Sequence, residues 1–267
     1  MAQGIYASTY KNGMTYYRVS ITYRNKHISL GSTDDENTAI MRYKLASSIL
    51  RNNKYILTDY NKTDQSLDFE KWIVIMNFRD NGLYFKTPIY LSKSYFTYYL
   101  SRQRELFFDV DDMFFYSTHK IFMRGNYLFV NDYGMQINIL SRFGIRNHSS
   151  LGKDYLFIDG NPNNFKYENI KINNPYIGVE QVIINHKPVY KAKIHLKGYV
   201  TLGYFQSIHK AAIAYNKAVD FMLRYITPDK NYSKNYIDAI STDEVEFYYT
   251  SIKLPAYLIN KVSLPDY

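Results

Sequence analysis

An internal repeat constrains this chain more than any other feature of its sequence. Residues 4–51 align with residues 176–224, so that Gly4 falls opposite Gly178 and Tyr17 opposite Tyr190. From Leu30, opposite Leu202, to the end of the repeat the alignment needs no gap. A repeat of this length predicts two copies of one structural module.

The second copy predicts the architecture of that module. Turn-forming residues separate three strand-like runs, at 177–184, 189–196 and 199–204. A helix with Ser207 as its N-cap should follow, because apolar residues then recur at spacings of three and four: Ile208, Ala211, Ala212, Tyr215, Ala218, Val219, Met222 and Leu223. We therefore expect a three-stranded antiparallel sheet with one helix on one face, and an α+β fold class for the whole chain.

The middle strand of the second copy alternates apolar and basic residues. Tyr190, Ala192 and Ile194 should face the helix, which leaves the basic residues between them on the open face. A basic face suits a phosphate-lined groove, and a narrow β-sheet can enter the major groove of DNA; the alternative is an ordinary solvated surface. The candidate DNA-contacting residues are Tyr6, Ser8, Arg18, Ser20, Thr22, Arg24, Lys26, His27 and Ser29 in the first copy, and Gln181, Lys191, Lys193, His195, Lys197, Tyr199 and Thr201 in the second.

The distribution of charge favours the same kind of partner. The net charge is +9. Residues 1–52 hold seven basic and three acidic residues, residues 176–226 hold seven and two, and the remainder of the chain is balanced. Because the excess lies in the two copies, we expect a polyanion to be bound by both of them.

Four short motifs of the second copy are specific. They are Gly178-Val179, Tyr190-Lys191-Ala192-Lys193-Ile194, Leu202-Gly203-Tyr204-Phe205 and Ala211-Ala212-Ile213-Ala214-Tyr215-Asn216-Lys217-Ala218. These motifs resemble the Apetala-type (ethylene-response-factor) DNA-binding domain, and the first copy resembles it more loosely, with Val19 and Thr33 at two motif positions. The resemblance implies that the three-stranded sheet binds the major groove. Many members use Arg and Trp on that sheet, so the target sequence does not carry over to the faces of this chain.

The stretch between the copies, residues 53–175, should form a separate domain. Its patterns predict helices over 67–78 and 93–106, a strand at 83–86, and a hairpin made of 127–130 and 135–140. Asp109, Asp111 and Asp112 form an acidic run that either binds Mg²⁺ or, as is more common, caps a helix or pairs with arginines.

A second resemblance lies in this stretch, in the order Ile158-Asp159-Gly160-Asn161, Asn163-Asn164 and Glu168-Asn169-Ile170. It is similar to the core of an HNH endonuclease and spans about residues 120–173. In that family an Asp holds the metal and the following His is the general base, but the aligned positions are Leu156 and Phe157, which can do neither. The resemblance therefore implies that metal-assisted hydrolysis is lost. Asp159, Gly160, Asn164, Glu168 and Asn169 would keep a loop-holding role.

Two histidines could restore an active site beside Asp154 or Asp159, namely His119 and His148. His148 lies in a polar run that is typical of an exposed loop, and a single surface histidine is far more often inert than catalytic. We expect no catalytic residue, no bound metal and no cofactor.

The remaining composition sets the cellular context. The chain has no cysteine, which excludes disulfides and Cys-ligated zinc. No apolar run reaches the ~18 residues of a membrane span, and the first residues lack a signal-peptide pattern. We expect no membrane partner and a cytoplasmic, nucleoid-associated protein of a bacterium or phage. Residues 227–267 should form a short packed extension that covers a core or makes a homodimer contact.

Together these patterns predict a sequence-specific binder of double-stranded DNA that regulates transcription. Its modules, residues 1–52 and 176–226, would flank a central spacing domain. Two alternatives stay open: a homing-type or phage nuclease with an atypical active site, and an architectural DNA-binding protein of a mobile element.

Overall fold

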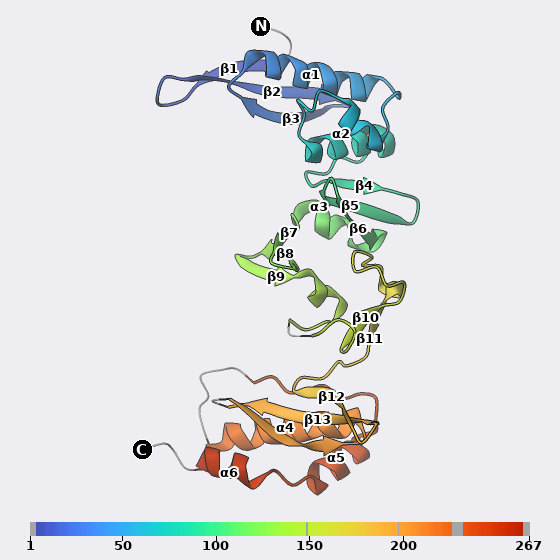
Figure 1. Cartoon of the computed structure of the whole chain (residues 1–267). Coiled ribbons are helices and arrows are strands. Elements are labelled where there is room, and N and C mark those ends of the chain that lie inside the picture. The colour runs from blue at the N-terminus through green and yellow to red at the C-terminus, as the bar shows by residue number, and fades with distance from the viewer. Residues whose placement is uncertain (1–3, 148, 197, 226–231, 264–267) are drawn as a thin grey trace. The chain divides into compact units, whose positions relative to one another are not determined.

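The computed structural model describes residues 4–147, 149–196, 198–225 and 232–263. Within them the chain forms helices and several small sheets, which confirms the α+β class (Figure 1). The chain divides into two compact units, Met1–Phe143 with Phe157–Ile170 and Gly144–Leu156 with Lys171–Tyr267. Each unit contains one copy of the repeat.

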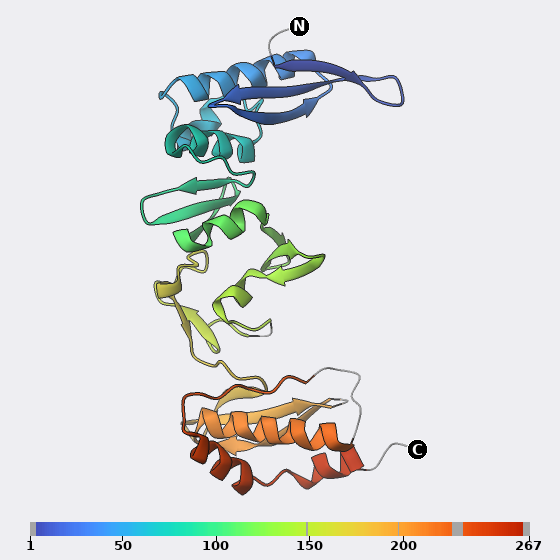
Figure 2. The same ribbon diagram turned by 180° about the vertical axis from the view of Figure 1, so that it is seen from behind.

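The first copy has the expected sheet and helix. Strands β1 (Ile5–Thr9), β2 (Thr15–Tyr23) and β3 (Lys26–Thr33) form an antiparallel sheet in that order. Helix α1 (Glu36–Arg51) covers one face of it (Figure 2). The helix begins at Asp35, whose carboxylate accepts a hydrogen bond from the Thr38 N–H at 2.6 Å and satisfies one free donor of the first turn. The sheet residues buried toward α1 are Ile5, Val19, Ile21, Ile28 and Leu30.

The apolar core of the first copy continues beyond residue 52. A 3-10 turn (Leu57–Lys62) leads to helix α2 (Phe69–Asn81), which confirms the helix expected over 67–78. Trp72 and Ile75 of α2 are buried in the same cluster as Ile49 of α1. The Arg79 guanidinium donates to the carbonyl oxygens of Ile49 and Asn52, both at 3.4 Å, and so caps the C-terminal end of α1. The first module thus gains a second helix, which packs against α1, from a stretch that the sequence pattern assigns to the central domain.

Two predictions for the central stretch, a helix over 93–106 and a strand at 83–86, are wrong. Instead of a helix over 93–106, strands β4 (Ile89–Leu91), β5 (Tyr95–Ser101) and β6 (Arg104–Asp109) form an antiparallel sheet, and 83–86 is not a strand. The segment is rich in aromatic residues, which favour strands. Its fully buried residues also recur at a period of two, as in Phe96 with Tyr98 and Leu106 with Phe108.

The next part of the first unit contains one short helix and one further sheet. Helix α3 (Met113–Thr118) follows a 3-10 turn (Val110–Asp112) and precedes a sheet of β7 (Phe122–Arg124), β8 (Tyr127–Asp132) and β9 (Met135–Asn138). The pair β8–β9 is the expected hairpin, and its turn residues Tyr133 and Gly134 both have positive φ. A further 3-10 turn spans Ile139–Phe143.

The second unit repeats the module. Strands β12 (Val179–Ile184), β13 (Lys187–His195) and β14 (Tyr199–Phe205) form an antiparallel sheet, and helix α4 (Ile208–Tyr225) packs on it. Ser207 precedes the helix, and its Oγ accepts from the Lys210 N–H at 3.5 Å.

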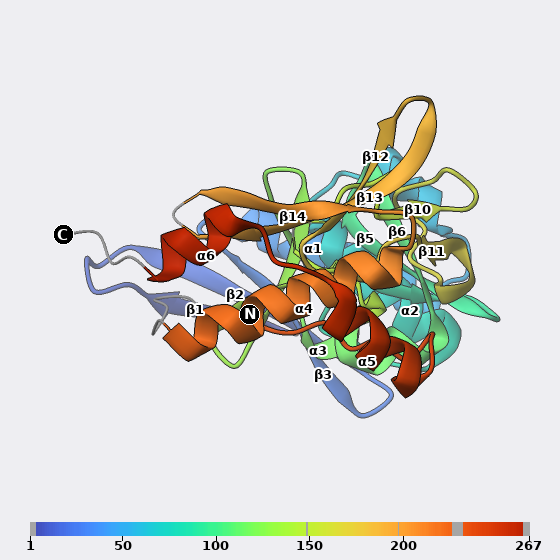
Figure 3. The ribbon, with the colours of Figure 1, turned by 90° about the horizontal axis from the view of Figure 1, so that it is seen from below.

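The described part of the tail covers the core of this module. Helices α5 (Thr242–Ser251) and α6 (Ala256–Ser263) lie with α4 on one side of the sheet (Figure 3). Ile252, Leu258 and Val262 are buried in the cluster that holds Ala218 and Met222 of α4. The Lys217 ammonium donates to the carbonyl oxygens of Tyr249 (2.6 Å) and Ile252 (2.8 Å), which caps α5.

A backbone contact shared by the two copies shows that the repeat is structural. Gly4 and Gly178 both have positive φ and lie against the helix residues Tyr43 and Tyr215. The Gly4 carbonyl accepts from the Ser20 N–H at 2.9 Å, and the Gly178 carbonyl accepts from the Lys193 N–H at 2.7 Å. The register of the middle strand shifts at the aligned positions Val19/Ser20 and Ala192/Lys193.

Candidate nucleic-acid interface

Each sheet has one face that its helix does not cover, and the strand registers define which side chains occupy it. In the first copy, Tyr6 pairs with Arg18 and Thr22 pairs with His27, one residue out of phase with the buried Val19 and Ile21. We call this surface the N-terminal face; it comprises Tyr6, Ser8, Tyr16, Arg18, Ser20, Thr22, His27, Ser29 and Ser32. By the same rule the C-terminal face comprises Glu180, Val182, Val189, Lys191, Lys193, His195, Tyr199, Thr201 and Tyr204, of which Val189 is buried.

Aromatic and hydroxyl groups dominate the N-terminal face. Tyr6 is 54% exposed beside Arg18, which is also exposed. At the end of the β1–β2 hairpin the rings of Tyr10 and Tyr16 stack with their centroids 4.3 Å apart. Arg18 is the one lysine or arginine on this face. The N-terminal face therefore attracts phosphate less strongly than the net charge of the whole copy suggests.

Three residues predicted for the N-terminal face do not belong to its exposed surface. The Arg24 guanidinium reaches the Phe78 carbonyl of α2 (3.5 Å), and the Lys26 ammonium lies over the Tyr84 ring (5.1 Å). Arg24 is the first residue of the tight β2–β3 turn, and Lys26, which follows the turn, pairs with Tyr23 on the helix side. Ser20 has the right orientation but is only 8% exposed, because a small side chain on the middle strand lies below its neighbours.

The C-terminal face holds a cluster of charged and aromatic side chains. Lys191 lies between Glu180 and Tyr204 on the adjacent strands, and His195 lies opposite Tyr199, with the two rings edge to face at 5.1 Å. The Lys193 ammonium is 2.6 Å from a Glu180 carboxylate oxygen. This hydrogen bond lowers the pKa of Glu180, so the glutamate is ionised at neutral pH.

The sequence prediction for the C-terminal face needs one correction. Gln181 pairs with Tyr190 and therefore lies on the helix side of the sheet, whereas its neighbour Glu180 lies on the open face. The alignment of Gly4 with Gly178 could have found this, because it places Glu180 opposite Tyr6. The structure places Lys191, Lys193, His195, Tyr199 and Thr201 on the face, and Lys197 lies outside the described residues.

The HNH-like segment forms a tightly bonded loop. It runs from β10 (Tyr155–Phe157) through a 3-10 turn (Tyr167–Asn169) to β11 (Ile170–Ile172). The Asp159 carboxylate accepts from the Asn161 N–H (2.8 Å) and the Asn164 amide (2.7 Å). The buried Asn169 amide accepts from the Asp159 N–H (2.9 Å) and donates to the Asn164 carbonyl (2.8 Å). These bonds are those expected of a loop-holding role.

The positions that HNH enzymes use for chemistry are occupied differently. Phe157 is 8% exposed and packs edge to face with Phe165, with centroids 5.6 Å apart. His119 is stacked on Phe115 and lies 3.4 Å from Asp132. Among the residues that the structure describes, no group of three His, Asp or Glu side chains could hold a metal ion. His148 lies outside those residues.

The acidic run at 109–112 serves a structural purpose. Asp112 is buried and pairs with Arg142, and Asp109 accepts a hydrogen bond from the Tyr167 N–H at 2.7 Å. Of the three uses predicted for these carboxylates, pairing with an arginine is observed, at Asp112.

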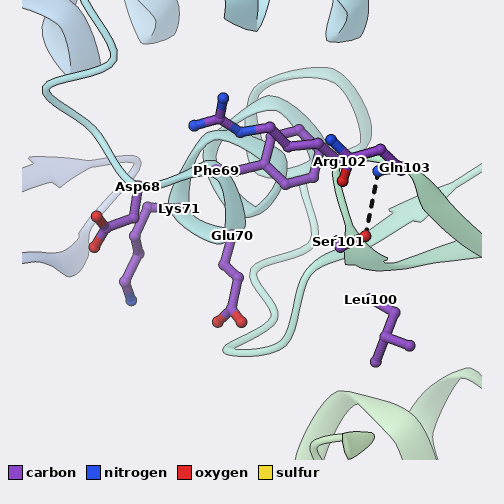
Figure 4. Close-up of a pocket in the computed structure, with 8 residues that line it drawn as sticks. All are labelled: Asp68, Phe69, Glu70, Lys71, Leu100, Ser101, Arg102 and Gln103. Atoms are coloured by element: carbon purple, nitrogen blue, oxygen red, sulfur yellow. Dashed lines mark hydrogen bonds between the residues drawn. The ribbon is translucent and has the colours of Figure 1, made fainter. Parts of the chain in front are cut away.

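A polar cavity in the first unit lies between the start of α2 and the β5–β6 hairpin (Figure 4). Asp68, Glu70 and Lys71 line one side, and Arg102 and Gln103 line the other. Glu70 is already paired with Lys120 at 2.7 Å. The one hydroxyl of the lining, Ser101 Oγ, accepts a hydrogen bond from the Gln103 N–H at 3.2 Å, and no histidine in the described part of the chain lines the cavity.

Comparisons with protein-family models, curated proteins and solved structures gave no match. In the described ranges, no helix is both long and apolar enough to cross a membrane.

Proposed function

We propose that this chain is a sequence-specific double-stranded DNA-binding protein that contacts the major groove with its N-terminal and C-terminal faces and regulates transcription. The observation that carries the proposal is the repeat of one sheet-and-helix module with an uncovered polar face in each copy. In a bacterial or phage-infected cell such a protein would associate with the nucleoid.

The dimensions of the sheets support this use. Strands in a sheet are about 4.8 Å apart, so three strands span roughly 10 Å between the outer backbones. The major groove is about 12 Å wide and admits a narrow β-ribbon. A sheet with one face free of helices can therefore present that face to base edges.

The side chains on the faces suit base recognition as well as phosphate binding. Arg18 and Lys191 are of the types that donate to guanine O6 and N7, and Thr22 and Thr201 can contact either hydrogen-bonding groups or the thymine methyl. Each face also carries one histidine, His27 on β3 of the N-terminal face and His195 on β13 of the C-terminal face. Three cations on the two faces, Arg18, Lys191 and Lys193, would supply the phosphate or guanine contacts.

The two faces differ at most aligned positions, which favours a target with two dissimilar half-sites. Tyr6 corresponds to Glu180, Arg18 to Lys191 and Ser20 to Lys193. Two tethered modules gain affinity together when the DNA spacing matches the reach between them. The central stretch would set that reach.

A nuclease is the competing function, and the buried Phe157 counts against it because a phenyl ring cannot activate water. The proposal is tested by selecting duplexes from a random pool with the full chain. An enriched motif is expected, and plasmid incubated with Mg²⁺ or Mn²⁺ should stay intact. Strong binding without an enriched motif would favour an architectural role, and cleavage would contradict the proposal.

A further inference from the structure

One acidic residue lies on the edge strand of a surface that the proposed function turns toward a polyanion. Glu180 is on β12, on the C-terminal face, directly across from Lys191. Its side chain is 35% exposed, so the carboxylate is accessible from the open side of the sheet. A carboxylate at this position repels the phosphate backbone of any duplex. A surface that binds DNA of any sequence would therefore have a higher affinity without it.

The carboxylate is also held in one place. Its partner Lys193 is the diagonal neighbour on β13, a separation that long side chains can bridge across a strand pair. The Lys193 ammonium donates to Glu180 at 2.6 Å and lies 5.1 Å from the centroid of the Tyr199 ring. An ammonium has three donors, so Lys193 can orient Glu180 and still contact DNA.

We propose that Glu180 is a base-reading residue that accepts a hydrogen bond from the N4 amino group of a cytosine in the major groove, with Lys193 as its positioning residue. This inference rests on the proposed function. Cytosine is the base whose major-groove edge offers a donor without an adjacent acceptor, and Glu or Asp is the side chain that accepts from it. The acidic group gives discrimination at the expense of affinity, because it repels every duplex that lacks the cytosine donor.

The neighbouring lysine strengthens the assignment. Lys191 lies across from Glu180 and is of the type that donates to guanine O6 and N7. A carboxylate and an ammonium side by side thus match a cytosine and a guanine at neighbouring positions. The N-terminal face has Tyr6 at the position aligned with Glu180 and carries no acidic residue among its members, so the preference for cytosine should belong to one half-site only.

The experiment compares duplexes selected from a random pool by the full-length wild type and by Glu180→Gln. The amide has nearly the same shape but can donate as well as accept. The wild type should enrich one fixed cytosine that E180Q no longer distinguishes, and replacing that base should weaken wild-type binding by on the order of tenfold or more while changing E180Q binding little. Glu246→Gln removes an exposed acidic group from α5 in the same unit and should leave the selected motif unchanged.

The outcomes separate the possible failures. If E180Q enriches the same motif and binds every duplex more tightly by the same factor, Glu180 merely neutralises Lys193 and the inference is wrong, while the proposed function stands. If the wild type enriches no motif, the sequence specificity in the proposed function fails and this inference fails with it. Lys193→Gln supplies a second readout: a positioning role predicts weaker preference for the cytosine, whereas a phosphate contact alone predicts a uniform loss of affinity.

Discussion

Tyr215 of α4 lies so close to Gly178 that a Cβ at the glycine would come nearer than 3.0 Å to two carbon atoms of the ring and to the Lys193 carbonyl oxygen. The first copy repeats the contact with Tyr43 and Gly4. In each copy the glycine carbonyl also accepts from the middle strand, so one residue joins the first strand, the middle strand and the helix. This three-way contact holds the sheet at a fixed distance from its helix.

Gly178→Ala should destabilise the second module by about 3 kcal/mol, from overpacking together with the strain of a positive φ. Hydrogen exchange of the β13 amides measures the local change. Gly152→Ala is a matched control in the same unit, because Gly152 has a positive φ but nothing within 4 Å of its added Cβ. Equal effects of the two substitutions would show that backbone strain, and not the contact with Tyr215, explains the glycine.

Lys191→Gln should weaken DNA binding and make it less sensitive to salt. Three cations on the two faces predict that log K falls with log salt at a slope of roughly −3, and removing one of these positive charges from the DNA-contacting surface reduces the magnitude by up to about 1. Lys253→Gln, which changes an exposed lysine of the same unit that lies outside the C-terminal face, should leave the slope unchanged. Titrations of a selected duplex at several salt concentrations give both values, and a flat wild-type dependence would rule out phosphate contacts.

The ion pair between Glu180 and Lys193 should stabilise the folded protein only above acidic pH. The pairing lowers the pKa of Glu180 from its ordinary value of 4.5. The stabilisation is therefore fully present above that value and is lost as the pH falls through the lower pKa of the folded state. The unfolding free energies of wild type and Glu180→Gln should differ at pH 7 and converge in strong acid. A difference that grows on acidification would contradict the pairing.

Asn169→Ala should loosen the HNH-like loop. The Asn169 side-chain amide accepts a hydrogen bond from the Asp159 N–H and donates one to the Asn164 carbonyl. Leaving both of these groups unpaired should destabilise the folded protein by about 1–3 kcal/mol. Thermal or denaturant unfolding measures the loss. Glu168→Ala alters the exposed neighbour and should stay within about 0.5 kcal/mol of wild type. If both variants unfold like wild type, the loop is held by other contacts.

The sequence predicts those features that leave a periodic or repeated signal. The two modules, the stripe on α4, the hairpin β8–β9 and the open position of Lys191 follow from repeats and alternation. The prediction of a helix over 93–106 is wrong because a short run of apolar and aromatic residues fits a helix and a strand nearly equally well.

Contacts between distant segments leave no such signal. Arg79 and Lys217 cap helices whose ends lie far from them in sequence. The approach of Arg24 and Lys26 to the region around α2 likewise depends on tertiary packing, as does the burial of Ser20. Glu180, by contrast, could have been placed on the open face from the alignment and the strand period alone.

The most direct test of the central claim is the affinity of the full chain for its selected duplex, measured for the wild type and for a variant with both Arg18→Ala and Lys191→Ala. Neither side chain is buried in its module's core, so the variant should fold, which circular dichroism can check. If the two sheet faces bind DNA, the double variant should lose at least tenfold in affinity, as expected for two specific contacts of roughly 1–3 kcal/mol each. Unchanged affinity in a folded double variant would show that DNA binds elsewhere and would contradict the account.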